Sequence, residues 1–288
     1  KESYGSENFD SNWEKFKYMV KESNDKRNIA TKFLISSLKK IKKNRSEIYI
    51  LDHGCGSGLK AMYLIALGYE NVYGVNVNAE VEILNKIIKK KLNIFENRFF
   101  KTEGKKLPFE SKKFDFIMSC QVLEHINDDL IDLYYSEEGR VLKTGGYAYH
   151  EVPHLLVPYD SHSRLWFAHW APNFMKPLTY GILKSIQQRK NLLREGKNYA
   201  KRFSGEFLRL RTPRFHRKKL KEYIGNEIFE EDLLNRVIDK EEIKDYDADA
   251  SSSLRRLINF LLKFPLIGNL FVKLLKNLMM LHPLTKKL

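Results

Sequence analysis

The chain has 288 residues, of which 43% are hydrophobic and 12% aromatic, so it can bury a large core and is not an intrinsically disordered chain. Its net charge of +15 favours anionic partners such as phosphates, nucleic acid or an anionic membrane surface. Two cysteines exclude a disulfide framework and fit a reducing compartment. Residues 1–25 lack the apolar segment of a signal peptide, and no uncharged apolar stretch reaches the roughly 18 residues of a spanning helix. We therefore expect a cytoplasmic protein.

Helices and strands are predicted to alternate through the first half of the chain. Residues 11–43 have helical spacing of apolar side chains, and residues 48–51 form a continuous apolar run, as in a strand buried on both faces. A glycine loop, a helical stretch to residue 67 and a lysine-rich helix over 79–91 follow, and the further strands are expected at 72–75, 98–101, 114–118 and 147–150. Strands separated by helices imply right-handed crossovers. The pattern predicts an α/β fold with a doubly wound, mostly parallel, Rossmann-like sheet and helices on both faces.

The alternation stops near residue 155, which predicts three parts. Residues 1–44 form an N-terminal helical segment, 45–155 a cofactor-binding core, and 156–288 a mainly helical extension that shapes the substrate site. Between Lys184 and Lys221 there are 14 Lys or Arg residues and two Glu residues. Such a run is either a solvated helical hairpin or a binding face for RNA, anionic lipid or a phosphate-linked substrate.

The tail from residue 254 combines leucines at helical spacing with interspersed lysines and arginines. A basic amphipathic helix of this kind can lie in a membrane interface, here the inner membrane face. It can equally cap the sheet or form the contact face of a homo-oligomer.

The segment Leu51-Asp-His-Gly-Cys-Gly-Ser-Gly58 follows the first predicted strand. Its three glycines let the backbone turn sharply and approach a ligand closely. The loop ends at a helix start, where free N–H groups favour polar or anionic ligand groups. A dinucleotide site needs the spacing G-x-G-x-x-G, whereas this loop has G-x-G-x-G. Asp52 can accept hydrogen bonds from an ammonium group or from the loop amides. The alternative is a tight turn without a ligand.

This loop resembles the first motif of the class I S-adenosylmethionine-dependent methyltransferases. Four further segments resemble that family in order, over residues 45–153: Val72–Asn78, Glu103–Phe109 with Phe114-Asp115, Gln121–Ile126 and Arg140–Gly146. Beyond residue 155, Pro158–His162 and Phe167–Trp170 are similar to extensions in bacterial methyltransferases near cell-surface glycan pathways. The resemblance implies S-adenosylmethionine as the cofactor.

The resemblance also implies which residues bind the cofactor. The glycine loop would line the methionine and ribose end, and Asp52 would meet the amino group or organise the loop. Residues at the ends of the next strands would hold the ribose, the adenine and the methyl end. The full expected set is Asp52, Gly54, Cys55, Gly56, Ser57, Gly58, Asn76, Val77, Glu103, Gly104, Cys120 and Gln121.

Asn76 departs from the family, which usually has Asp or Glu there to bind both ribose hydroxyls. An amide keeps one acceptor but loses the charge-assisted pair, a loss of about 1–2 kcal/mol. Either Asn78 or a water compensates, or the site is degenerate and the chain is a non-catalytic methyltransferase-fold partner subunit.

Three histidines are the candidates for catalysis. His125 follows the fourth predicted strand, where some similar O-methyltransferases place a divalent metal on E-x-x-E-H and a later His; this chain has Gln121 at the first position, so the metal set is incomplete. His162 is the preferred base, with Asp160 close enough to orient it. Each of these residues can instead be structural.

His154 closes the segment His150-Glu-Val-Pro-His154, which matches the zinc-protease pattern H-E-x-x-H. That pattern needs a helix, whereas this segment is a predicted strand and contains Pro153, so a protease is not expected. His154 lies where substrate would approach, just beyond the fifth strand.

The sequence thus predicts methyl transfer from S-adenosylmethionine to a small molecule, most specifically O-methylation of a sugar, glycan or lipid-linked acceptor. An RNA methyltransferase is the first alternative, because of the basic run. A non-catalytic partner subunit is the second.

Overall fold

The computed structural model describes residues 29–78, 80–230 and 280–288, with isolated positions between 260 and 278. The helix expected over 11–43 falls partly outside this range, and its described part is α2 (Ile29–Leu38). Most of the predicted amphipathic tail also lies outside the described residues.

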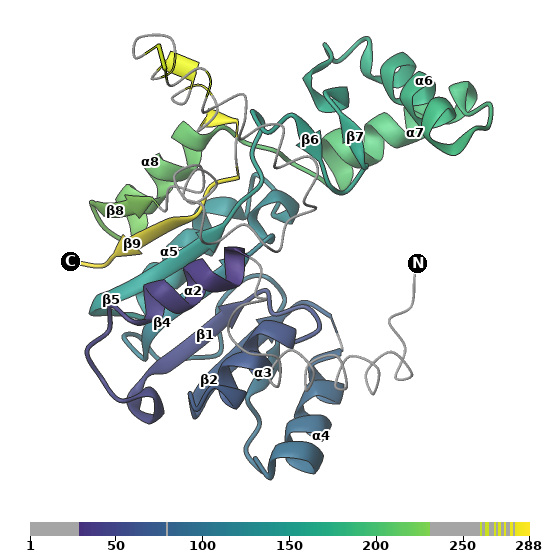
Figure 1. The fold of residues 1–288 in the computed structure, drawn as a ribbon. Helices are drawn as coiled ribbons and strands as arrows, with labels where there is room; N and C mark the ends of the chain where they lie inside the picture. Colours follow the sequence, from purple (N-terminus) through teal and green to yellow (C-terminus); the bar gives the residue numbers. More distant parts are fainter. Residues whose placement is uncertain are drawn as a thin grey trace.

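A seven-stranded sheet forms the centre of the molecule, in the order β3-β2-β1-β4-β5-β9-β8 (Figure 1). The pairs among the first five strands are parallel, as the alternation of helices and strands predicts. These strands are β1 (Tyr49–His53), β2 (Asn71–Asn76), β3 (Phe99–Lys101), β4 (Phe114–Cys120) and β5 (Leu142–Glu151). The doubly wound, mostly parallel fold is confirmed.

Helices cover both faces of this sheet (Figure 1). Phe116 and Met118 of β4 pack with α2, α3 (Leu59–Ala66) and α4 (Glu80–Leu92), whereas Ile117 packs with α5 (Ile131–Val141) and α8 (Pro213–Tyr223) on the other face. Successive side chains of a strand point to opposite faces, so β4 is mostly apolar because both of its faces are buried.

Two strands from the C-terminal extension complete the sheet, and the sequence did not predict these two strands. β9 (Pro283–Lys286) pairs antiparallel with β5 and with β8 (Glu227–Glu230). The chain therefore returns to the core after residue 212. Leu284 is buried among the core residues of the first five strands.

Residues 156–209 form a lobe that projects from the sheet (Figure 1). It contains the short hairpin of β6 (Tyr159–Asp160) and β7 (Leu165–Trp166), then α6 (Lys176–Gln188), α7 (Gly196–Lys201) and a π-helical turn over Arg202–Glu206. Tyr180, Ala200 and Phe203 belong to a small apolar cluster of its own. None of the helices in the described part of the chain is long and apolar enough to span a bilayer.

Candidate active site

The glycine loop turns sharply between β1 and α3 and leaves open space beside it. Gly54, Gly56 and Gly58 have φ values of +90°, +51° and +70°, which favour glycine. A Cβ on Gly54 would lie 2.4 Å from Cγ2 of Val122, whereas a Cβ on Gly56 would meet no atom within 4 Å. The N–H groups of Gly54 and Cys55 both donate to the Val75 carbonyl at 2.9 Å, which fixes the loop against the end of β2. Ser57 is exposed at its tip.

The residues expected near ribose and adenine follow β2 and β3. The Oδ1 atom of Asn76 accepts a hydrogen bond from the Val77 N–H at 2.8 Å, so the side-chain acceptor already has a partner. Val77 and Glu103 are exposed, and Gly104 has a φ of +74°. A Cβ on Gly104 would lie 4.0 Å from Val77, so these segments are neighbours at one edge of the site.

A charged cluster at the ends of β1, β4 and β5 includes two residues that the sequence did not predict for the cofactor site. Lys60, at the start of α3, places Nζ 3.0 Å from Oε2 of Glu151. Gln121 donates from Nε2 to the other carboxylate oxygen of Glu151 at 2.9 Å. Burial raises the pKa of Cys120 to about 12, although Lys60 lowers it, so this thiol stays protonated at neutral pH. Burial likewise raises the pKa of Asp52 to about 7, against the effect of Lys60.

A buried polar network supports the glycine loop from the α5 side. His53 precedes the loop, and its Nδ1 atom lies 3.0 Å from Oε1 of Glu138. The other oxygen of Glu138 lies 2.8 Å from Nε2 of His150. The ring of Tyr134 stacks on His53 with centroids 3.8 Å apart, and its hydroxyl donates to the His53 carbonyl. Glu138 thus fixes the residue from which the loop departs, and His150 is structural in this network.

Glu124, His125 and His162 converge near the end of β4. One ligand atom from each lies within 4.8 Å of the others. Nε2 of His125 and Nε2 of His162 are both 3.9 Å from Oε1 of Glu124. Glu124 is buried, and in the described structure neither carboxylate oxygen has a hydrogen-bond partner. Burial raises the pKa of Glu124 to about 7.

Both histidines of this triad are oriented through their second ring nitrogen. Nδ1 of His125 lies 2.8 Å from the Phe207 carbonyl, so it carries the proton of a neutral ring and leaves Nε2 as an acceptor. Nδ1 of His162 lies 3.3 Å from Asp160 Oδ1, and this hydrogen bond raises the pKa of His162. Burial lowers the pKa of His125. Oriented imidazoles beside an unpaired carboxylate are typical ligands for a divalent metal.

The other candidates do not join this triad. Gln121 turns toward Glu151, in a left-handed conformation with a φ of +55°. His154 is fully buried, and its Nδ1 accepts a hydrogen bond from the Leu156 N–H at 3.2 Å. The structure therefore brings His125 and His162 together and leaves His154 inside the fold, away from solvent.

Comparison with known proteins places the similarity in the same core. Residues 51–150 match a family model described as a methyltransferase domain. The ubiquinone biosynthesis O-methyltransferase of Pelagibacter ubique is 35% identical over 123 residues, which are 42% of this chain and 47% of that protein. The chain thus matches about half the length of this curated relative.

Two solved structures are similar over comparable shares of the chain. An S-adenosylmethionine-dependent methyltransferase from Methanosarcina mazei is 27% identical, covers 38% of this chain and 54% of its own, and has a TM-score of 0.34. Protein PH0226 from Pyrococcus horikoshii OT3 is 27% identical, with coverage of 42% and 55% and a TM-score of 0.36.

Proposed function

We propose that this protein, whose residues 51–150 match a methyltransferase domain model, transfers the methyl group of S-adenosylmethionine to a hydroxyl oxygen of a small, sugar or lipid-linked acceptor. The observation that carries the proposal is the triad Glu124, His125 and His162. It follows β4, and ligands of such sheets bind at the carboxyl ends of the strands. An oxygen nucleophile needs a base or a metal at this place.

The residues around the glycine loop fit S-adenosylmethionine. The open space at Gly56 accommodates a ligand close to the backbone. Asp52 and Lys60 lie beside the loop, and the ionised forms of their side chains would match the ammonium and carboxylate groups of a methionine end. The cofactor supplies a methyl group on a good leaving group, so the protein mainly has to orient the acceptor and receive its proton.

The triad fits a divalent metal, which Glu124, His125 and His162 would hold. The fit rests on the buried Glu124 carboxylate, whose oxygens lack partners, and on two imidazoles that direct Nε2 toward it. Such a metal would act as a Lewis acid and favour the ionised form of an acceptor hydroxyl. His162, oriented by Asp160, is the residue that would take up a proton if the site works without a metal.

The lobe supports an acceptor that is presented at an anionic bilayer. Four exposed apolar side chains lie four residues apart along one face of α6 and the turn before it: Phe174, Leu178, Ile182 and Ile186. Residues 156–209 hold ten Lys or Arg residues and three Asp or Glu residues. Apolar side chains beside basic ones suit insertion among anionic headgroups.

The test uses S-adenosylmethionine with a labelled methyl group and glycan, lipid and RNA fractions as acceptors, analysed by mass spectrometry. We expect an O-methylated glycan or lipid product, with turnover reduced about 100-fold or more in Glu124→Gln. Isothermal titration with Mn²⁺ should show binding to the wild type and loss in Glu124→Gln, with Glu96→Gln as an exposed control.

Other results would replace this proposal. Label found only in RNA would favour an RNA methyltransferase. Absence of cofactor binding at millimolar concentration, with the protein folded, would favour a non-catalytic partner subunit.

A further inference from the structure

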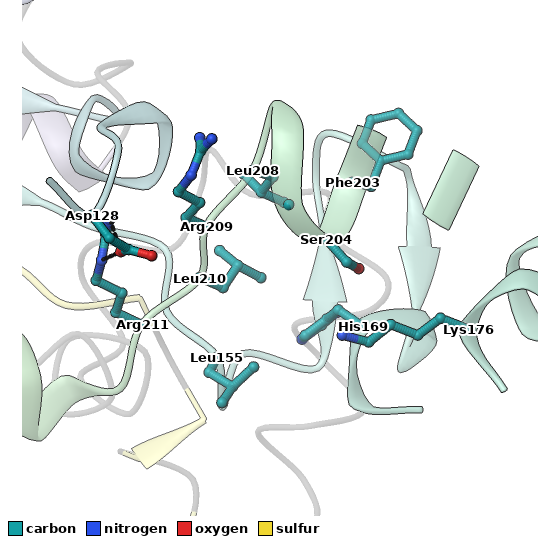
Figure 2. A pocket seen from close by; sticks show the side chains of 11 residues that line it. Asp128, Leu155, His169, Lys176, Phe203, Ser204, Leu208, Arg209, Leu210 and Arg211 are labelled. Carbon is teal, nitrogen blue, oxygen red and sulfur yellow. Dashed lines mark hydrogen bonds and ion pairs between the residues drawn. The ribbon is translucent and has the colours of Figure 1, made fainter. Parts of the chain in front are cut away.

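A cavity of about 290 Å³ lies between the lobe and the core, beside the triad. Figure 2 shows Arg209 and Arg211 on one side of it and Lys176 with His169 on the other. Its volume is at the lower end of the roughly 300–1,000 Å³ range of ligand pockets, so it suits a ring or a short group and not a polymer.

One chain segment both lines this cavity and holds the triad. The Arg209 N–H donates to the Glu124 carbonyl at 2.7 Å, and the Phe207 carbonyl is the partner of His125 Nδ1 at 2.8 Å. A molecule in the cavity would therefore lie next to the segment that contacts the triad, where the acceptor hydroxyl is proposed to react.

The cavity has an excess of positive charge. Its one carboxylate, Asp128, is paired with Arg211 at 2.7 Å, and the same guanidinium donates to two core carbonyls. Arg209 and Lys176 have no carboxylate partner among the described residues, and the Arg209 guanidinium donates to the Glu206 carbonyl at 3.1 Å. Burial lowers the pKa of Lys176, which indicates an ammonium partly removed from water. Two cations without counter-ions face a space that an anion can enter.

The rest of the lining is apolar. Leu155, Phe203, Leu208 and Leu210 contribute to the wall, and the Ser204 hydroxyl adds a donor. Phe203 and Leu208 are buried, so the wall is part of the folded lobe. Cations at the ends and aliphatic or aromatic side chains between them select an amphipathic ligand over a simple ion.

We infer that this cavity binds an oxyanion, phosphate or carboxylate, carried on an apolar or ring-shaped group, and that Lys176 and Arg209 are the residues that recognise it. The inference deepens the proposed function, on which it rests for the idea that the ligand is part of the methyl acceptor. Bonds from charged donors to such an oxyanion are among the strong hydrogen bonds of proteins.

Isothermal titration of the full chain with model compounds tests this inference without any methyl transfer. The probes are phenyl phosphate and benzoate, with phenol as the neutral analogue and inorganic phosphate as the analogue without a ring. We expect phenyl phosphate or benzoate to bind at least about 10-fold more tightly than phenol and than inorganic phosphate. The tighter of the two anions identifies the oxyanion. Equal binding of phenol or of inorganic phosphate would overturn the inference.

Three variants locate the site. Lys176→Met should weaken the binding of the preferred anion at least about 10-fold, Lys176→Arg should retain it within about 3-fold, and Lys190→Met, an exposed lysine of the same lobe, should change nothing. Equal affinities of the Lys176→Met and Lys190→Met variants would contradict the inference.

Unchanged S-adenosylmethionine affinity verifies that each variant is folded, and Arg209→Met provides the same comparison if Lys176→Met fails to fold. Anion binding without any transfer of label would refute the proposed function and leave the anion site standing.

Discussion

The ammonium group of Lys60 lies 3.0 Å from the carboxylate of Glu151, a residue 91 positions later in the chain. The contact joins the start of α3 to the end of β5 above the strand ends where the cofactor is expected. Burial disfavours the charged lysine, but the Cys120 thiolate, where it is ionised, and the Glu151 carboxylate outweigh this effect and raise the pKa of Lys60. Lys60 is therefore a fixed positive charge beside the glycine loop.

Replacing Lys60 by Met should weaken S-adenosylmethionine binding about 10-fold, since the carboxylate of the cofactor would lose a charged donor. The same substitution should leave the affinity for 5′-methylthioadenosine unchanged, because that compound lacks the amino acid end. Isothermal titration of both ligands measures the difference, and Lys86→Met on the exposed face of α4 is the control. An equal loss for the two ligands would show that Lys60 only supports the fold.

The affinity for S-adenosylmethionine should fall as pH decreases through about 7, because the pKa of Asp52 is raised to about 7 by burial and its ionised form is needed for the ammonium group. Titrations between about pH 5.5 and 7.5 should show this dependence in the wild type and lose it in Asp52→Asn. A pH dependence that persists in Asp52→Asn would rule out this carboxyl group as its source.

The stabilities of the wild type and Asp52→Asn should also differ with pH, but here the ionised Asp52 is unfavourable, because it is buried in the folded protein. The pKa of Asp52 rises from 3.8 to about 7 on folding. The stability that its protonated form contributes to the folded protein is therefore complete below pH 3.8 and is lost as pH rises through 7. Asp52→Asn should therefore be more stable than the wild type above pH 7 and similar to it near pH 4. Urea unfolding at the two pH values measures this.

Local patterns in the sequence predicted the parallel strands and the glycine loop because their signals are local. The apolar run at 48–51 predicts a buried strand, and the closely spaced glycines predict a tight turn, without reference to any distant residue. In contrast, β8 and β9 have four residues each and mixed polarity, and they are distant in sequence from each other and from β5. Nothing within such short segments indicates their partner.

The site was predictable only in part, for a related reason. The sequence pointed to Glu124 and His125 together, through E-x-x-E-H, and separately to His162, but their convergence depends on the path of the β6–β7 hairpin. Lys60 has no motif of its own, and Glu151 was read only as part of H-E-x-x-H. The one signal available was a lysine two residues after the last glycine of the loop, and its partner is evident only when the ends of β4 and β5 are adjacent.

Glu138→Gln should lower the free energy of unfolding by about 3–5 kcal/mol, because a buried ionised group that holds two histidines would be removed. Burial opposes ionisation, yet His150 and His53 outweigh it and lower the pKa of Glu138 to about 2. This stabilisation is present above the ordinary value of 4.5 and is lost as pH falls toward 2.

Urea denaturation at neutral pH measures the Glu138 effect. Asp132→Asn on the same helix, where an exposed carboxylate pairs with Lys219, should cost less than about 1 kcal/mol. A cost for Glu138→Gln as small as that of the control would contradict the role of this network.

The final prediction concerns the exposed stripe on α6. Leu178, Ile182 and Ile186 are 57%, 41% and 70% exposed, and insertion of each into a bilayer would contribute about 1.5 kcal/mol or more. The triple substitution to Ser should therefore reduce binding to phosphatidylglycerol-containing vesicles at least about 100-fold in a flotation assay. Binding should also weaken with added salt and on purely phosphatidylcholine vesicles, because the lobe is basic.

The control is Phe95→Ser, at an exposed apolar residue beyond α4, which should float like the wild type. If the triple variant floats as well as the wild type, α6 does not contact the membrane, and deletion of residues 254–288 then tests the tail as the remaining site.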